Sequence, residues 1–268
     1  MEEQEILWEI DNDSPTCFVA KHYVTNGYNF HRHRNTEIYG VIRGEILVTI
    51  NEETRCLRSG EMVVINGLEG HSFKVDTEAE VFCFLIGIKY RRIFDSIYGN
   101  KRLPHFLTDT QYNKKIYDSI CPLFRGEEEL TELKKNGLTC LILSEIVEHY
   151  GLADGEYNSK GYDLIEDLIQ YIYEHYSEKM TLTSLAEHFC VTPKYLSKRI
   201  SQYIGVDIRK FINDIRIQKA MQMRYDPEYR NHSLQEIGSL CGFQSMETFY
   251  KVWRRNYGDL REESDGQS

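Results

Sequence analysis

The sequence lacks any long hydrophobic run. Its longest apolar stretch, residues 81–88, is far shorter than the roughly 20 residues that a membrane-spanning helix needs. The acidic N-terminus, MEEQEILWEI, has no basic segment ahead of an apolar run, so no secretory signal is expected. The chain is therefore expected to be a cytoplasmic protein that does not bind a membrane.

Motifs for the common catalytic chemistries are also absent. The seven cysteines are scattered, odd in number and never spaced as CxxC, which is typical of reduced thiols in a cytoplasmic protein. No GxGxxG, P-loop, GxSxG or zinc-finger spacing occurs. We therefore expect no enzyme activity, no catalytic residues and no obligatory cofactor.

Length and charge indicate two domains of different character. A chain of 268 residues is long for one hydrophobic core. The net charge of −10 disfavours a nucleic-acid partner at first sight, but residues 1–158 hold 17 basic and 26 acidic residues. Residues 179–258 instead hold 13 basic and 7 acidic residues, a net charge of +6. Because local charge decides contact with phosphate, the back half remains a candidate for DNA binding.

The front half has the pattern of a small antiparallel barrel. Short runs at 37–43, 46–50, 62–65 and 81–88 are rich in Val, Ile, Tyr and Phe and are separated by turn residues. Within 105–150 the apolar residues recur at helical spacing instead. We expect a sensor barrel at 1–100, a helical dimerisation segment at 101–150 and a polar linker, GLADGEYNSK, at 151–160.

The rest of the chain, 161–268, is expected to be all helical and to contain an internal repeat. Thr192-Pro193 is a helix start, and Ser233 with Glu236 forms a capping box. A short helix, a tight turn and a second helix occur at about 183–203 and again at 234–256. A longer helix, 208–224, joins the two copies.

The second helix of each copy has one apolar and one polar face. Leu196 and Ile200 anchor the first, and Phe249 and Trp253 anchor the second, each pair four residues apart. An α-helix fits the major groove, where outward polar side chains reach base edges. The outward residues are Lys194, Ser197, Lys198 and Ser201 in the first copy, and Met246, Glu247, Tyr250 and Lys251 in the second.

This pattern resembles the AraC/XylS family of transcription regulators. The matching segments are LTSLAEHFCVTPKYLSKRISQYIG (182–205), RIQKA (216–220) and SLQEIGSLCGFQSMETFYKVWRRNYG (233–258). The resemblance implies a double helix-turn-helix domain, with Gly238 where the family usually has Ala. It implies base contacts from Lys194, Ser197 and Lys198 in the first recognition helix. In the second it implies contacts from Met246, Glu247, Tyr250 and Lys251.

A second group of residues lies in the expected barrel. His31 and His33 are followed by Glu37 and, much later, by His71. This order resembles the cupin pattern, with Asn66 replacing the proline that cupins commonly have before the last histidine. The resemblance implies a cupin-like barrel in which the four side chains meet. They are expected to contact a ligand, and a divalent transition metal (Zn, Fe, Mn or Ni) is the other occupant that they suit.

The predicted architecture is therefore multidomain: a cupin-like antiparallel β-barrel followed by an all-α double helix-turn-helix domain. The resemblance implies a sequence-specific DNA-binding regulator, an activator, that responds to a small-molecule effector such as a sugar. Its expected partners are double-stranded DNA, a second copy of the chain and RNA polymerase. Two alternatives stay open: a metal-binding cupin enzyme with an appended DNA-binding domain, and a regulator controlled by a partner protein.

Overall fold

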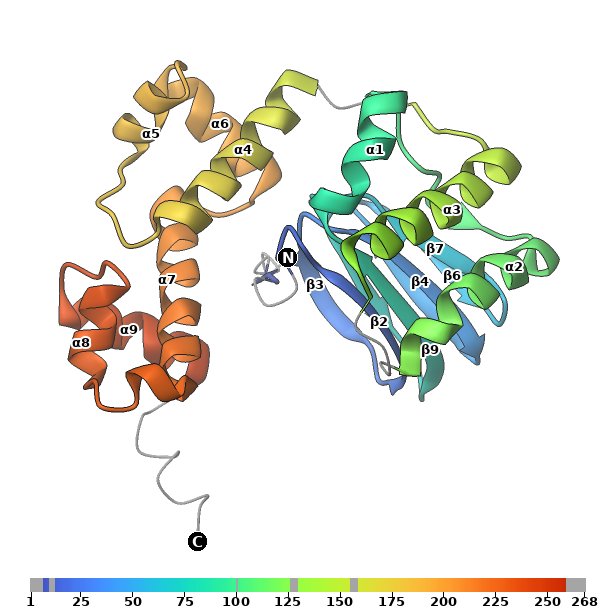
Figure 1. Cartoon of the computed structure of the whole chain (residues 1–268), viewed down its shortest axis with the longest axis horizontal. Helices are drawn as coiled ribbons and strands as arrows, with labels where there is room; N and C mark the ends of the chain where they lie inside the picture. Colours follow the sequence, from blue (N-terminus) through green and yellow to red (C-terminus); the bar gives the residue numbers. More distant parts are fainter. Residues whose placement is uncertain (1–6, 10–12, 100, 126–129, 155–158, 259–268) are drawn as a thin grey trace, which may run out of the picture. The chain divides into compact units, whose positions relative to one another are not determined.

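The chain forms two compact units, residues 1–159 and 160–268 (Figure 1). The computed structural model describes residues 7–9, 13–99, 101–125, 130–154 and 159–258. Residues 155–158 of the expected linker therefore lie outside the described residues. Within the described part of the chain, no helix is both long and apolar enough to span a bilayer.

The first unit contains two five-stranded sheets, with the orders β1-β3-β8-β5-β6 and β10-β7-β4-β9-β2. The pairs among the described strands are antiparallel, apart from the parallel pair of β1 with β3. This confirms the predicted antiparallel barrel. The strands are β1 (Leu7–Trp8), β2 (Phe18–Thr25), β3 (Tyr28–Arg32), β4 (Thr36–Arg43), β5 (Glu45–Ile50), β6 (Glu53–Arg58), β7 (Met62–Ile65), β8 (His71–Lys74), β9 (Ala79–Ile86) and β10 (Phe106–Leu107).

Strand β9 is buried on both faces, which explains its uninterrupted apolar sequence. Val81 and Leu85 point into the barrel core, where they pack with residues of the opposite sheet such as Val48. Phe82 and Phe84 point outward and pack against helices. Side chains alternate along a strand, so a strand covered on both sides needs apolar residues at every position.

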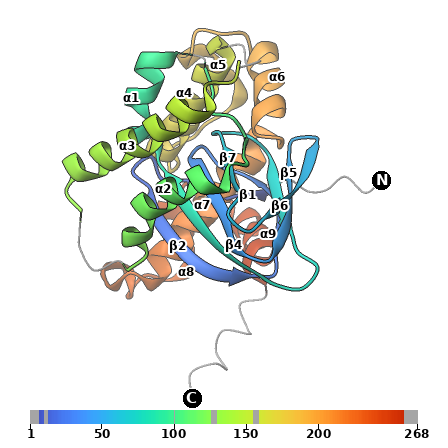
Figure 2. The ribbon, with the colours of Figure 1, turned by 90° about the vertical axis from the view of Figure 1, so that its right-hand side faces the viewer.

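Helices cover the outer face of the sheet that contains β9. These are α1 (Ile88–Tyr98), α2 (Thr110–Ile120) and α3 (Glu132–Tyr150), with a 3₁₀ turn at Cys121–Arg125. Figure 1 shows α2 and α3 lying across this sheet, and Figure 2 shows them on the side away from β5 and β6. Ile116 and Ile142, which are fully buried, belong to the core between the helices and the sheet.

Helix α1 corrects the expectation that the strand continues to residue 88. The strand ends at Ile86, and α1 begins at Ile88 after the extended Gly87. A Cβ on this glycine would lie 2.4 Å from the carbonyl oxygen of Pro15, so the close backbone approach excludes a larger residue. The helix then buries Tyr90 and Phe94, whose four-residue spacing puts them on one face.

The second unit is all helical, as predicted. Thr192 caps the helix that opens with Pro193, and Ser233 and Glu236 form the expected capping box. Arg216 of the long helix donates 2.7 Å hydrogen bonds to two backbone carbonyl oxygens of the loop before α5. The helices are α4 (Ser159–His175), α5 (Leu182–His188), α6 (Pro193–Tyr203), α7 (Ile208–Tyr225), α8 (Leu234–Leu240) and α9 (Met246–Tyr257), with a 3₁₀ turn at Pro227–Tyr229.

Candidate functional site

Helices α5 and α6 form the first helix-turn-helix unit. Leu185 and Ala186 of α5 are buried, and so are Leu196 and Ile200 of α6, which pack the two helices together. The predicted contact residues of α6 lie on its other face and are exposed. They are Lys194, Ser197 and Lys198.

Helices α8 and α9 form the second unit. Ile237, Phe249 and Trp253 are fully buried and form its core. The turn contains Gly242, which has a φ of +87°, and a Cβ there would lie 2.4 Å from the carbonyl oxygen of Ser177. Only glycine fits this turn, because both its left-handed conformation and its close backbone contact exclude a side chain.

The predicted contact residues of α9 are less uniform than those of α6. Glu247 and Lys251 are exposed, whereas Met246 and Tyr250 are partly buried and pack against the core of the second unit. Arg254 is exposed in the last turn. The free face of α9 therefore offers polar and charged groups with both signs of charge, and Met246 and Tyr250 reach its edge.

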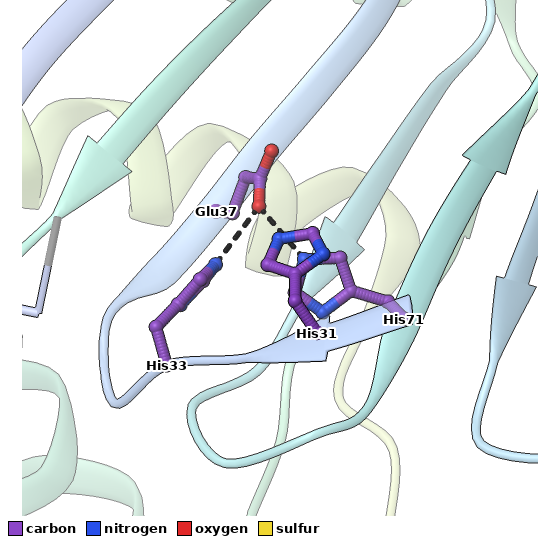
Figure 3. A group of neighbouring side chains, drawn as sticks. All are labelled: His31, His33, Glu37 and His71. Atoms are coloured by element: carbon purple, nitrogen blue, oxygen red, sulfur yellow. Dashed lines mark hydrogen bonds and ion pairs between the residues drawn. The ribbon is translucent and has the colours of Figure 1, made fainter. Parts of the chain in front are cut away.

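Four buried side chains converge inside the barrel, as the sequence pattern predicts. His31 is the last but one residue of β3, and His33 directly follows that strand. His71 is the first residue of β8, which belongs to the same sheet. Glu37 comes from β4 of the opposite sheet (Figure 3). One potential ligand atom from each side chain lies within 4.8 Å of the others. We call His31, His33, Glu37 and His71 the barrel quartet.

One carboxylate oxygen organises the barrel quartet. Glu37 Oε2 lies 3.1 Å from His33 Nε2 and also 3.1 Å from His71 Nε2 (Figure 3). The ring of the third histidine, His31, lies 4.0 Å from that of His71, centroid to centroid, and is tilted by 56° to it. All four residues are at most 4% exposed.

The hydrogen bonds of the three Nδ1 atoms define the tautomer of each histidine. In each histidine Nδ1 lies 2.8 to 3.1 Å from a backbone carbonyl oxygen, which accepts only, so Nδ1 carries the hydrogen. In a neutral ring, Nε2 then carries a lone pair, which faces the centre of the barrel quartet. The Nε2 atoms of His33 and His71 face the same carboxylate oxygen, so each contact requires a proton between the two atoms or a bound cation. The carbonyl oxygens belong to Asn29, Asn35 and Glu69.

The protonation of the metal-free barrel quartet follows from these contacts. Burial alone would raise the pKa of Glu37, but hydrogen bonds from His33 and His71 outweigh it and hold that pKa well below its usual value. Burial alone would lower the pKa of His33, but its hydrogen bond to Glu37 outweighs burial and raises it. For His31, burial and the neighbouring His71 lower the pKa to about 3. A Glu37 carboxylate that accepts a hydrogen bond from a protonated His33, with His31 neutral, is therefore self-consistent.

The donor set also fits a divalent transition metal. Three imidazole Nε2 atoms and a carboxylate suit Zn, Fe, Mn or Ni, and a carbonyl partner on Nδ1 is the usual support for a metal-binding histidine. His31, His33, Glu37 and His71 would hold the ion. A bound ion would supply a Lewis acid that polarises an oxygen atom of a ligand.

A pocket of about 330 Å³ opens beside the barrel quartet. Glu37 and His31 contribute to its wall, while His33 and His71 are not among the described residues that line it. Cys83 donates a hydrogen bond to Glu37 Oε1 at 3.2 Å, and burial, followed by this carboxylate, raises the pKa of the thiol well above its usual value. The remaining lining residues are Glu9, Val19, Lys21, Tyr23, Tyr28, Tyr39, Phe73 and Leu85.

Sequence patterns did not identify most of this pocket wall. Lys21 and Tyr23 come from β2, whose partly exposed residues do not alternate clearly, and Cys83 comes from β9. The register of β2 with β9 places Lys21 opposite Cys83. Only this strand pairing brings the three side chains to one surface, so no spacing along the chain could have indicated them.

Two protein-family models match the chain. A cupin domain model matches residues 24–87, which include the barrel quartet. A helix-turn-helix domain model matches residues 185–261, which include both recognition helices.

Curated relatives are regulators of the helix-turn-helix type. An uncharacterized HTH-type transcriptional regulator of Staphylococcus aureus strain MSSA476 is 25% identical over 235 residues, which cover 84% of this chain and 31% of the relative. The HTH-type regulator YpdC of Escherichia coli K12 is 26% identical over 149 residues, 51% of each chain. The chain thus spans about a third of the length of the first of these relatives.

The fold has a counterpart among solved structures. ToxT from Vibrio cholerae superposes with a TM-score of 0.57 at 15% identity, covering 88% of this chain and 93% of ToxT. At this identity the likeness concerns the fold alone. The chain therefore combines a cupin domain with a helix-turn-helix domain of the AraC type, and the curated proteins that it resembles are transcription regulators of the helix-turn-helix type.

Proposed function

We propose that the protein is a sequence-specific DNA-binding transcription regulator, an activator, controlled by a small organic effector. The observation that carries the proposal is the pair of helix-turn-helix units, each with a recognition helix whose polar face is free. Lys194 and Lys198 lie four residues apart on the exposed face of α6, and Lys251 lies on that of α9. Such side chains can contact both phosphates and base edges.

The pocket supports control by an effector. Its volume of about 330 Å³ is within the range of small-molecule sites. A barrel filled by side chains would instead have favoured a regulator controlled by a partner protein. One ToxT structure contains an unsaturated fatty acid, so this fold accommodates a ligand. Here the wall combines aromatic rings with Glu37, His31 and Lys21, which favours a small polar molecule such as a sugar.

The proposal makes the barrel quartet a hydrogen-bonding wall rather than a catalytic centre. Glu37 and His31 face the pocket, whereas His33 and His71 hold Glu37 from behind. The protein would therefore act by binding, as a regulator and not as an enzyme. Its site of action would be the cytoplasm, where its proposed partners, double-stranded DNA and RNA polymerase, are found.

Exposed apolar side chains on α3 and α1 support a homodimer. Leu133 and Leu141 of α3 are 83% and 48% exposed, and Ile93 and Ile97 of α1 are 42% and 65% exposed. Each pair is spaced by four or eight residues and so lies on one helix face. We propose that a second copy of the chain covers this surface. The effector would then act by favouring one arrangement of the two DNA-binding domains.

Selection of bound fragments from a random double-stranded DNA pool tests the proposed function. We expect enrichment of one sequence motif and, for that motif, an affinity at least about 10³-fold above that for a scrambled duplex at the same salt concentration. Binding of all duplexes with equal affinity would contradict sequence-specific regulation. The absence of binding at low salt would contradict DNA binding altogether.

A further inference from the structure

Asn66 connects the barrel to a distant segment of the chain. Its Nδ2 atom donates a hydrogen bond to the Leu103 carbonyl oxygen at 3.1 Å, and its Oδ1 atom accepts one from the Leu103 backbone nitrogen at 3.1 Å. The side chain thus pairs with the backbone of Leu103 as a neighbouring strand would. A proline at this position, as in the cupin pattern, could form neither bond.

Glu69 strengthens the same connection. Its buried carboxylate accepts hydrogen bonds from Arg102 Nη1 at 2.6 Å and from His105 Nε2 at 3.0 Å. It also accepts one from the backbone nitrogen of Asn66 at 2.9 Å. Residues 101–105, which we call the strap, are therefore held to the 66–71 loop by two buried side chains. Breaking a buried, charge-assisted cluster is costly, so a displacement of the 66–71 loop should displace the strap with it.

The 66–71 loop is in turn hydrogen-bonded to two members of the barrel quartet. His71 Nδ1 donates to the Glu69 carbonyl oxygen at 2.9 Å, and the Leu68 backbone nitrogen donates to the His33 carbonyl oxygen at 2.8 Å. A shift of either histidine when a ligand binds would therefore displace the backbone from which Glu69 projects.

The other side of the strap contacts the end of the first unit. Arg102 and Ala153 exchange two backbone hydrogen bonds, of 3.0 and 2.9 Å, in an isolated antiparallel bridge. Lys101 forms an ion pair with Asp154. Residues 151–154 are the last described residues before α4, the first helix of the second unit.

We propose that the strap transmits the state of the barrel quartet to residues 151–154, and through them to the chain entering the DNA-binding unit. The route runs from His71 through Glu69 and Arg102 to Ala153, and each step is a hydrogen bond. This inference rests on the proposed function for its biological purpose. Its physical content is a coupling between two places in the first unit, and coupling of this kind acts in both directions.

Amide hydrogen exchange of the full-length chain tests the coupling without an effector or DNA. The amide of Ala153 is protected by its bond to the Arg102 carbonyl oxygen, so its exchange rate reports on the bridge. We expect His71→Gln to raise this rate about tenfold while the amides of β2 keep their rates. Tyr28→Phe, which keeps the ring and removes the hydroxyl that donates to Glu9, is the matched control and should leave Ala153 unchanged.

A second variant distinguishes transmission from general loosening. In a Glu69→Gln background Ala153 should already exchange faster, and adding His71→Gln should change its rate less than twofold. In the reverse direction, Arg102→Lys should speed exchange of the Leu68 amide. An unchanged Ala153 amide in His71→Gln, additive effects of the two substitutions, or equal acceleration throughout the unit would each overturn the proposal. Failure of sequence-specific DNA binding would leave these exchange results standing, and the two proposals can therefore fail separately.

Discussion

The ring of Phe249 lies directly against Gly238. A Cβ built on this glycine would come within 3.0 Å of ring atom Cδ2 and within 3.3 Å of two further ring atoms. Both residues are buried, and Phe249 also packs against Phe243 and Trp253. The glycine, unusual for the family at this position, thus allows α8 and α9 to approach closely.

Substitution Gly238→Val should therefore destabilise the second unit. The branched side chain would overlap the Phe249 ring, and overpacking of this kind costs about 1–3 kcal/mol of unfolding free energy. Ser239→Val is the matched control, since Ser239 is exposed on the same helix, and its substitution reports the helix propensity of valine together with the loss of the bond from Ser239 Oγ to the Gln235 carbonyl oxygen. Chemical denaturation followed by circular dichroism measures both variants. Equal losses for the two would contradict the steric explanation.

The protein should bind DNA more weakly when exposed lysines of its two recognition helices are replaced. Lys194→Ala and Lys251→Ala should each weaken binding to the selected DNA motif by about 1–3 kcal/mol, as expected for a base-edge contact. Lys74→Ala, an exposed lysine of the first unit, is the control for loss of charge and should bind as the unmodified protein does. Gel-shift titration at fixed salt provides the measurement. If both variants matched the control, the assignment of α6 and α9 would be wrong.

Self-association should depend on the exposed leucines of α3. We expect the double substitution Leu133→Glu and Leu141→Glu to raise the dimer dissociation constant at least about tenfold, since each buried charge costs more than 1.4 kcal/mol at an apolar interface. Leu240→Glu changes a leucine of α8 that is 45% exposed and serves as the control. Sedimentation velocity distinguishes monomer from dimer. A stable dimer of the isolated fragment 159–268 would instead place the dimer contacts outside 101–150.

The proposed organic effector predicts little bound metal. Protein purified without a histidine tag should contain well below one transition-metal ion per chain, and a chelator should leave its melting temperature unchanged. The reason is that Glu37 Oε2 already lies within hydrogen-bonding distance, 3.1 Å, of both His33 Nε2 and His71 Nε2 without an ion. Elemental analysis and thermal denaturation decide the matter. About one ion per chain, together with a large loss of stability on chelation, would identify the barrel quartet as a metal centre.

Local signals in the sequence predicted the helical unit well. Thr192-Pro193 and the Ser233–Glu236 capping box each begin a helix where expected, because a cap satisfies backbone donors within a few residues of chain. The barrel was harder to predict. Strands β4, β5 and β7 begin within one residue of the expected runs, whereas β2 and β6, which are largely exposed, carry no clear alternation of apolar residues.

The candidate site likewise combines residues that a sequence pattern predicts with contacts that no pattern predicts. The positions of His31, His33, Glu37 and His71 follow a spaced pattern, and the structure brings them together. The two hydrogen bonds between the Asn66 side chain and Leu103 have no such pattern, because Leu103 contributes only backbone atoms, which any residue would offer. The departure of Asn66 from the cupin pattern was the one available signal, and only the fold shows what it contacts.

Helix α7 gives the proposed binding site a direction. Its 18 residues form a rod of about 27 Å that joins two recognition helices with different exposed side chains in a single chain. Two identical chains with one recognition helix each would require a palindrome, whereas one chain with two different helices selects an asymmetric sequence. In the proposed homodimer each chain would bind its own asymmetric half-site, and inverting one half-site would turn that chain end for end on the DNA. The orientation of each half-site, and not merely its distance from the start of transcription, should therefore decide whether RNA polymerase meets the proposed activating surface.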